Sequence, residues 1–275
     1  MNKGCNAADD NVHLSPPGYD LNEPFQVVLN AELNSISGII YYPKDSSVFA
    51  TVNNDGLLFK IPLHGNQAIM RWRFDRNSGY GNLELKDSSF FVVINTGDIE
   101  TIEFKGSAIV TKRCVFPDSY KNKNEFESLF YDEQHKELVM LSKTGEEEKG
   151  KVVHAWGFSP ESQKYTPDMF SIPLNGLEEK NKKGKEKKIK CLPSAAAINP
   201  VTNEIYILSP QNQLLLVADK DGNAKEAYYL DPEIYNNVSG ISFTPKGDII
   251  ISNSVSESTA PKLLIVKRTL NNQPT

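Results

Sequence analysis

Two sets of mainly polar residues recur along this chain of 275 residues at intervals of about 45 residues, and their types and spacing could do chemistry. The first set opens five short apolar runs: Ser37, Gly81, Glu127, Ser194 and Ser239. The second set ends the run that follows each of these: Asn53, Asn95, Ser142, Ser209 and Asn253. Hydroxyl, amide and carboxylate oxygens bind polar ligands, and hard cations such as calcium take several of them at once.

We therefore predict a ligand site that draws on both sets. Its predicted members are Ser37, Asn53, Asn95, Glu127, Ser194, Ser209, Ser239 and Asn253. Glu127 is the only carboxylate among them and is the predicted metal ligand, with calcium as the candidate ion. A single carboxylate supplies too few ligands for tight calcium binding, so a second acidic residue would have to join it. The candidates are Asp55, Asp98 and Asp132. The alternative for each serine and asparagine is a cap that satisfies backbone groups at a strand end.

Short β-strands are the elements that must position these residues. Residues 192–223 hold three apolar, partly β-branched runs separated by Pro, Asn, Asp and Gly, a pattern typical of an antiparallel meander. The same three runs recur in five copies. The first strands are expected at 37–43, 81–87, 127–133, 194–200 and 239–245, the second at 49–53, 91–95, 138–142, 205–209 and 249–253, and the third at 57–61, 99–104, 152–158, 214–218 and 263–267.

This repeat predicts an all-β fold, a five-bladed β-propeller of four-stranded antiparallel blades. A helical solenoid of similar period would show a 3.6-residue spacing, which the sequence lacks. Fourth strands are expected at 67–72, 107–111 and 224–229. The last copy has no room for one, so we expect the apolar run 25–29 to pair there and close the ring. Six blades are the alternative, because the third interval is longer than the others and could hold another blade.

The predicted domains are a flexible N-terminal tail or lipoprotein tether (1–22) and one propeller domain (23–270) with a lysine-rich loop at 177–190. That loop is interpreted as a solvated insertion, and the alternative is a basic patch that binds anionic lipid or polyphosphate. Gly4-Cys5 is similar to the end of a bacterial lipobox, which predicts a lipid anchor at Cys5 and a place in the cell envelope, periplasmic or on the outer surface. A chance Gly-Cys pair in a cytoplasmic protein is the alternative.

Composition excludes some functions. The formal net charge of −5 argues against nucleic-acid binding, which normally needs a basic surface. Three scattered cysteines are too few for a disulfide framework. The four histidines have no zinc-ligand spacing, and no G-x-S-x-G elbow supports a serine hydrolase.

Four stretches carry a family resemblance: LNSISGIIYYP from Leu33, EFESLFYDE from Glu125, the run from Leu192 to Pro232, and VSGISFTPKGDIIISNS from Val238. Together with the lead-in YDLNEP from Tyr19, they resemble the bacterial SdiA-regulated family, the YjiK-like propeller proteins. The resemblance implies a five-bladed propeller, membrane-anchored or exported, with a connection to calcium in some members. Members often carry Glu-Gly at the start of an inner strand, and here only Glu127-Ser128 keeps the carboxylate.

Two functions remain open. The first is a non-catalytic, monomeric envelope propeller that binds a small molecule, a protein or calcium at the mouth of its central channel. The second is a metal-dependent hydrolase of phosphate esters or lactones, by analogy with other propeller enzymes. The second needs a cluster of carboxylates around the channel to hold the metal and activate water. Because the predicted inner strands carry few acids, the sequence favours binding.

Overall fold

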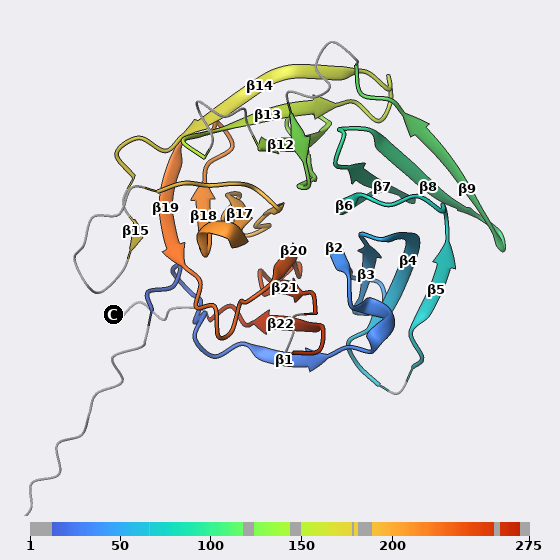
Figure 1. Ribbon diagram of the computed structural model, residues 1–275, viewed down its shortest axis with the longest axis horizontal. Helices are drawn as coiled ribbons and strands as arrows, with labels where there is room; N and C mark the ends of the chain where they lie inside the picture. The colour runs from blue at the N-terminus through green and yellow to red at the C-terminus, as the bar shows by residue number, and fades with distance from the viewer. Residues whose placement is uncertain are drawn as a thin grey trace, which may run out of the picture.

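The computed structural model describes residues 13–65, 67–117, 124–143, 150–177, 179–180, 189–255 and 259–269. Five antiparallel sheets surround a central axis, and the strands of each sheet step outward from that axis (Figure 1). This arrangement is a five-bladed β-propeller and confirms the predicted fold class. Cys5 and residues 181–188 of the predicted lysine-rich loop lie outside the described residues.

The first two blades follow the predicted repeat closely. The first blade comprises β2 (Ile36–Tyr42), β3 (Ser47–Val52), β4 (Asp55–Pro62) and β5 (Met70–Arg73). The second comprises β6 (Tyr80–Lys86), β7 (Ser89–Ile94), β8 (Ile99–Lys105) and β9 (Ala108–Cys114). A 3₁₀ turn, η1 (Ala31–Leu33), leads into the first blade.

The third blade has a divided inner strand. Where we expected one strand over 127–133, β10 (Glu125–Phe126) and β11 (Phe130–Asp132) both pair with β12 (Glu137–Lys143). Its outer strands are β13 (Val152–Phe158) and β14 (Tyr165–Pro173). Two elements account for part of the long third interval: the nine-residue β14 and the short β15 (Glu179–Lys180), which pairs with the edge of the next blade. The five sheets thus leave no sixth blade among the described residues, and this alternative is wrong.

The last two blades complete the ring. The fourth holds β16 (Ala195–Ile198), β17 (Ile205–Ser209), the 3₁₀ turn η3 (Pro210–Asn212), β18 (Leu214–Ala218) and β19 (Ala224–Tyr229). The fifth holds β20 (Val238–Phe243), β21 (Ile249–Asn253) and β22 (Lys262–Val266). Its outer strand is β1 (Phe25–Val28), which pairs antiparallel with β22 from Phe25 opposite Ile265 to Val28 opposite Lys262. Closure by the N-terminal strand is therefore confirmed.

One hydrophobic core cluster fills each of the five gaps between neighbouring blades. The middle strands are buried on both faces, as in β3 and β17, where every residue is buried. In the gap between the first and second blades, the Phe49 and Phe90 rings lie 4.6 Å apart. Because each blade packs against two others, none could bury its apolar faces alone.

The turn between the first and second strands has the same backbone feature in every blade. The residue that closes this turn has a positive φ in all five copies: Ser46, Asp87, Lys136, Asn203 and Gly247, with φ values of 55°, 57°, 56°, 62° and 90°. Only one of them is a glycine, and the other four adopt the left-handed region that residues other than glycine rarely occupy.

The segment before β1 packs onto the propeller from at least Tyr19 onward. Tyr19 and Leu21 are 8% and 3% exposed and belong to the core between the fourth and fifth blades. The Tyr19 hydroxyl donates to the Gly247 carbonyl at 2.6 Å, and the Tyr235 hydroxyl donates to the Leu21 carbonyl at 2.8 Å. The packed domain therefore begins before residue 23, inside the stretch that we expected to be a flexible tail. Apart from strands, the described residues form only short 3₁₀ turns, and none is a candidate for a bilayer-spanning helix.

The inner strands meet so closely that they close the axis. A Cβ on Gly38 would lie 2.5 Å from Asn82 Cα, and one on Gly81 would lie 2.6 Å from the Glu127 carbonyl oxygen. The buried Asn82 side chain reaches from the second blade to the fourth, where its Nδ2 lies 3.4 Å from the Ala196 carbonyl oxygen. The axis therefore has a separate cavity at each end.

Candidate functional site

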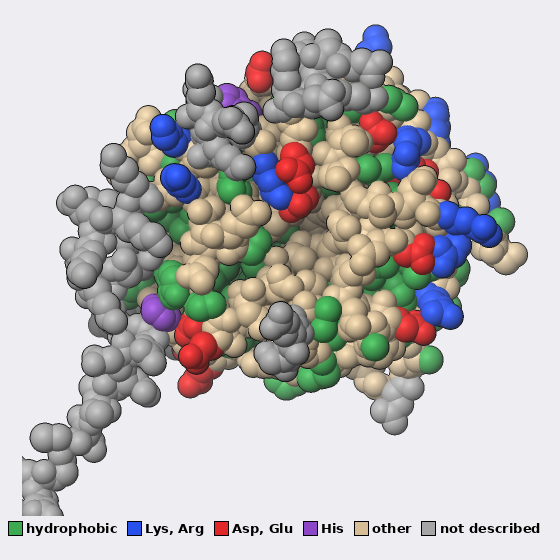
Figure 2. Space-filling model, in the orientation of Figure 1, with side chains coloured by type: hydrophobic (Ala, Val, Ile, Leu, Met, Phe, Trp, Pro, Cys, Tyr) green, Lys and Arg blue, Asp and Glu red, His purple; other side chains and the backbone are tan. Residues whose placement is uncertain are grey.

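The first cavity, of about 300 Å³, lies at the end of the axis where the inner strands begin. We call it the Glu127 mouth. All five blades contribute to it, and all five predicted strand-opening residues line it: Ser37, Gly81, Glu127, Ser194 and Ser239. Asn53 from the second predicted set, together with Ser35, Asn54 and Ser254, adds further polar groups. Figure 2 shows one face of the propeller hollowed near its centre, with acidic and basic side chains side by side at the hollow.

The three serine hydroxyls are held by weak hydrogen bonds. Ser37 Oγ lies 3.3 Å from Thr51 Oγ1 and 3.4 Å from the Gly81 carbonyl oxygen. Ser194 Oγ lies 3.4 Å from the Leu208 carbonyl oxygen, and Ser239 Oγ lies 3.1 Å from Ser252 Oγ. Contacts of this length are at or beyond the usual range, so each hydroxyl can reorient toward a ligand at little cost.

The only acidic residue lining this cavity is engaged by a lysine. Lys143 Nζ lies 2.6 Å from Glu127 Oε1 and 3.9 Å from Glu125 Oε1. The Glu127 side chain, 31% exposed, lines the cavity, whereas the Lys143 side chain, 12% exposed, lies behind it and is not part of the lining. This pair neutralises the one carboxylate that we predicted as a metal ligand.

The residues at this mouth do not fit a calcium ion. Calcium takes six to eight oxygen ligands, usually with several carboxylates, and an ammonium group beside the only carboxylate opposes a second cation. The three acids that could have joined Glu127 have other partners. Asp55 Oδ2 accepts from Arg73 at 2.8 Å, Asp98 Oδ1 accepts from the Phe116 amide at 2.9 Å, and Asp132 Oδ2 lies 2.6 Å from His135 Nδ1. No group of three or more His, Cys, Asp or Glu residues able to hold a metal occurs in the described part of the chain.

The remaining predicted site residues do not line the cavity. Asn95 is exposed, and its backbone pairs with Gly79 and Phe126. Buried Ser209 accepts from the Leu192 amide at 2.8 Å. Buried Asn253 donates to the Ile234 carbonyl at 2.9 Å. The Ser209 and Asn253 side chains therefore secure loops at strand ends, which is the role that we had weighed as the alternative.

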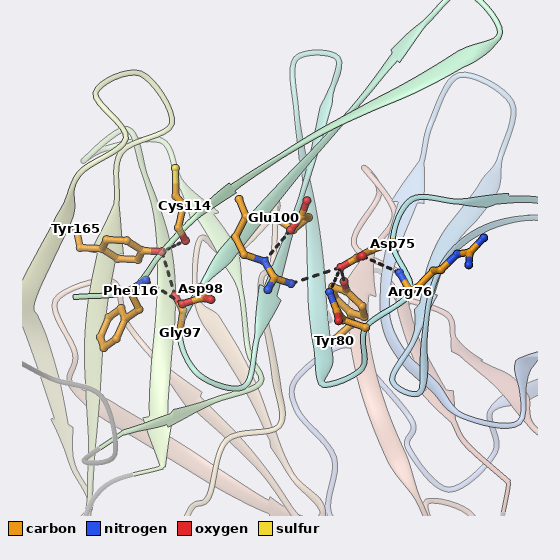
Figure 3. A network of polar contacts seen from close by, with 11 residues as sticks. Asp75, Arg76, Tyr80, Gly97, Asp98, Glu100, Cys114, Phe116 and Tyr165 are labelled. Carbon is orange, nitrogen blue, oxygen red and sulfur yellow. Dashed lines mark hydrogen bonds and ion pairs between the residues drawn. The ribbon is translucent and has the colours of Figure 1, made fainter. Parts of the chain in front are cut away.

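A polar network outside the cavity fixes the loop that leads into β6 (Figure 3). Arg113 Nε lies 3.0 Å from Glu100 Oε2, and Arg113 Nη2 lies 3.5 Å from Asp75 Oδ2. Asp75 in turn accepts from the Tyr80 hydroxyl. Burial and the Asp75 carboxylate raise the pKa of Tyr80. Since Tyr80 and Gly81 both line the mouth, this network positions the second blade's contribution to it.

A neighbouring contact anchors the third blade to the second on the same loop side. The Tyr165 hydroxyl donates to the Cys114 carbonyl oxygen at 2.9 Å and lies 3.1 Å from the Gly97 carbonyl oxygen (Figure 3). Burial, with the Asp98 carboxylate nearby, raises the pKa of Tyr165. Tyr165, Cys114 and Gly97 therefore hold the two blades together and do not line the Glu127 mouth.

The second cavity, of about 370 Å³, lies at the other end of the inner strands. We call it the Glu84 mouth. All five blades contribute to it as well, each through the residue three positions after its strand-opening residue: Ile40, Glu84, Phe130, Ala197 and Ser242. Burial raises the pKa of Glu84 to about 7, although the Leu85 and Tyr131 amides donate to its carboxylate. We did not predict Glu84 from the sequence. It lies three residues after Gly81, and a comparison of that position in the five repeats would have shown that only this copy carries an acid there.

Comparison with known proteins defines the class. No protein-family model matches the chain, and no curated protein matches it in sequence. A glutaminyl cyclase from Myxococcus xanthus superposes with a TM-score of 0.59 at 14% identity, over 89% of this chain and 98% of that chain. A luciferin-regenerating enzyme gives 0.52 at 11%, over 91% and 96%. Regucalcin from Agrobacterium tumefaciens, described as a calcium-binding protein, gives 0.51 at 11%, over 92% and 95%. Identities this low show the fold alone, and that fold is the β-propeller.

Proposed function

We propose that this protein is a non-catalytic binding propeller that takes a small, neutral, hydroxyl-rich molecule, such as a polyol or one sugar unit, at the Glu127 mouth. The observation that carries the proposal is a cavity of about 300 Å³ to which all five blades bring hydroxyl, amide and backbone groups around one carboxylate, Glu127, which Lys143 pairs from behind. A preformed pocket with a few convergent polar groups is the usual form of a small-molecule site.

The charge balance of the mouth selects the ligand class. The Lys143 ammonium, 2.6 Å from Glu127 Oε1, offsets the charge of the only carboxylate that lines the mouth, which favours a neutral ligand. A diol can donate to the Glu127 carboxylate, and hydrogen bonds to charged groups are stronger than neutral ones. Serine and asparagine groups around the pair then bind the remaining hydroxyls.

Two further parts of the proposal rest on sequence. The resemblance to the SdiA-regulated family supports a place in the cell envelope, and the Gly4-Cys5 pair supports a lipid anchor there. Calcium is the ion that the similarity to regucalcin suggests, and a metal-dependent hydrolase is the alternative activity. Because Lys143 opposes a dication at Glu127, we include calcium in the experiment as a competing ligand and do not assign it to the site.

The test is the thermal midpoint of the purified chain with millimolar monosaccharides and alditols, each in EDTA and in calcium. A bound ligand raises the midpoint by mass action. We expect at least one polyol or sugar to raise it in EDTA, and Lys143→Met to abolish that rise. The matched control is Lys225→Met, which removes the Lys225–Glu204 pair (3.0 Å) on β19, a strand that does not line the mouth. A midpoint that responds only to calcium, or to no polyol or sugar, would overturn the proposal.

A further inference from the structure

The Glu84 mouth carries a single acid among the five equivalent positions of the inner strands. At the corresponding position of the other four inner strands stand Ile40, Phe130, Ala197 and Ser242, none of them ionisable. A carboxylate facing such walls is costly unless a cation or hydrogen-bond donors compensate it. Without a compensating cation the protein favours the neutral form of Glu84, and a bound cation would favour the ionised form.

The protein supplies only part of that compensation. Glu84 Oε1 accepts from the Leu85 amide at 2.9 Å and Oε2 from the Tyr131 amide at 3.2 Å, which leaves each oxygen with further accepting capacity. Among the described residues, no side-chain cation forms an ion pair with Glu84. Lys86 lowers the pKa of this carboxyl only through space, and its ammonium is committed to Glu133, at 3.0 Å, and to the Tyr131 ring, 4.3 Å from the centroid.

The rest of the cavity is mainly apolar and aromatic. Its walls include Ile198, Phe243 and the rings of Tyr41 and Tyr131, and prolines from three blades stand at equivalent positions, six residues after the repeat start: Pro43, Pro200 and Pro245. The ionisable groups that face the cavity are Glu84, Glu133, Lys86 and the two tyrosines, so its formal charge is −1 when both glutamates are ionised.

We propose that the Glu84 mouth is a second ligand site, separate from the Glu127 mouth, for an organic ammonium ion with an apolar or aromatic body. The ammonium would donate to the free accepting positions of the Glu84 carboxylate, and the body would pack on the aromatic and proline walls, where the ring faces also attract a cation. A divalent metal would find only two carboxylates at this mouth, and one of them is paired with Lys86. A neutral apolar ligand would leave Glu84 uncompensated.

The test is a calorimetric titration of the full chain with phenethylammonium chloride, with 2-phenylethanol as the neutral partner of similar shape. We expect the amine to bind and the alcohol to bind at least about tenfold more weakly, because a charged hydrogen bond is lost. The affinity for the amine should rise from pH 5 to pH 7 and then level off, since only the ionised carboxylate attracts it.

Two kinds of variant test whether the amine binds at this mouth. Glu84→Gln should weaken amine binding about tenfold and remove its pH dependence. Ala197→Leu, which fills the cavity and leaves Glu84 intact, should weaken the amine as well. The control Lys143→Met, whose partner Glu127 lines the other mouth, should keep most of the wild-type affinity. Equal binding of amine and alcohol, an unchanged affinity in Glu84→Gln or Ala197→Leu, or no binding at millimolar concentration would overturn the proposal.

Discussion

Replacement of Glu84 by glutamine should stabilise the protein at alkaline pH and leave it almost unchanged at acid pH. Burial raises the pKa of this carboxyl from 4.5 to about 7 in the folded chain. A raised carboxyl pKa means that ionisation favours the unfolded state, so stability is lost between pH 4.5 and about 7 and stays low above that range. The full penalty is about 3 kcal/mol, an upper limit because Glu84 lines a cavity and is not enclosed in the core.

The assay is equilibrium urea unfolding of the wild type and Glu84→Gln at pH 5, 6, 7 and 8. Most of the penalty develops within this range, so the gap in unfolding free energy should widen by about 2 kcal/mol in favour of the variant. Comparison at each pH cancels the titration of all other groups. A constant gap for Glu84→Gln would refute the claim that this carboxyl is desolvated.

Two further substitutions test how the ring is held together, each by urea unfolding. Leu29→Ala should lower the free energy of unfolding by about 2–4 kcal/mol, because Leu29 directly follows the closing strand and is only 6% exposed. Its control, Val28→Ala, changes a side chain that is 70% exposed and should lower it by less than about 1 kcal/mol. Equal losses would contradict ring closure through a packed β1. Gly81→Ala should cost about 1–3 kcal/mol because its Cβ would meet the Glu127 carbonyl oxygen at 2.6 Å, and a neutral result would show that the inner strands can separate.

The repeat made the fold predictable. Runs of apolar residues punctuated by Pro, Asn, Asp and Gly at a regular period indicate blades, and the surplus run 25–29 indicated how the ring closes. The same alignment predicted which residues would meet at one mouth, because equivalent positions of equivalent strands must lie on one ring. Ser37, Glu127, Ser194 and Ser239 do so. Periodicity is therefore enough to place the inner strands.

Partners across strands were not predictable from the repeat. The Glu127–Lys143 pair depends on β10 pairing with the end of β12, where Glu125 lies opposite Lys143, in a blade whose inner strand is divided. Glu84 stands in the alternating sequence Leu83-Glu-Leu85, where a polar residue is normally expected on the solvent side. In a propeller that side of the inner strand faces the axis, which only the closed ring reveals.

The central claim is that the Glu127 mouth binds a neutral polyol or sugar through the Glu127–Lys143 pair. The most direct measurement is a calorimetric titration, in EDTA, of the sugar or polyol that gives the largest thermal shift, with wild type, Lys143→Met and Lys225→Met. The account predicts binding to wild type and Lys225→Met and its loss in Lys143→Met. Binding that requires calcium, or that strengthens when Lys143 is removed, would contradict it and would favour a metal at Glu127.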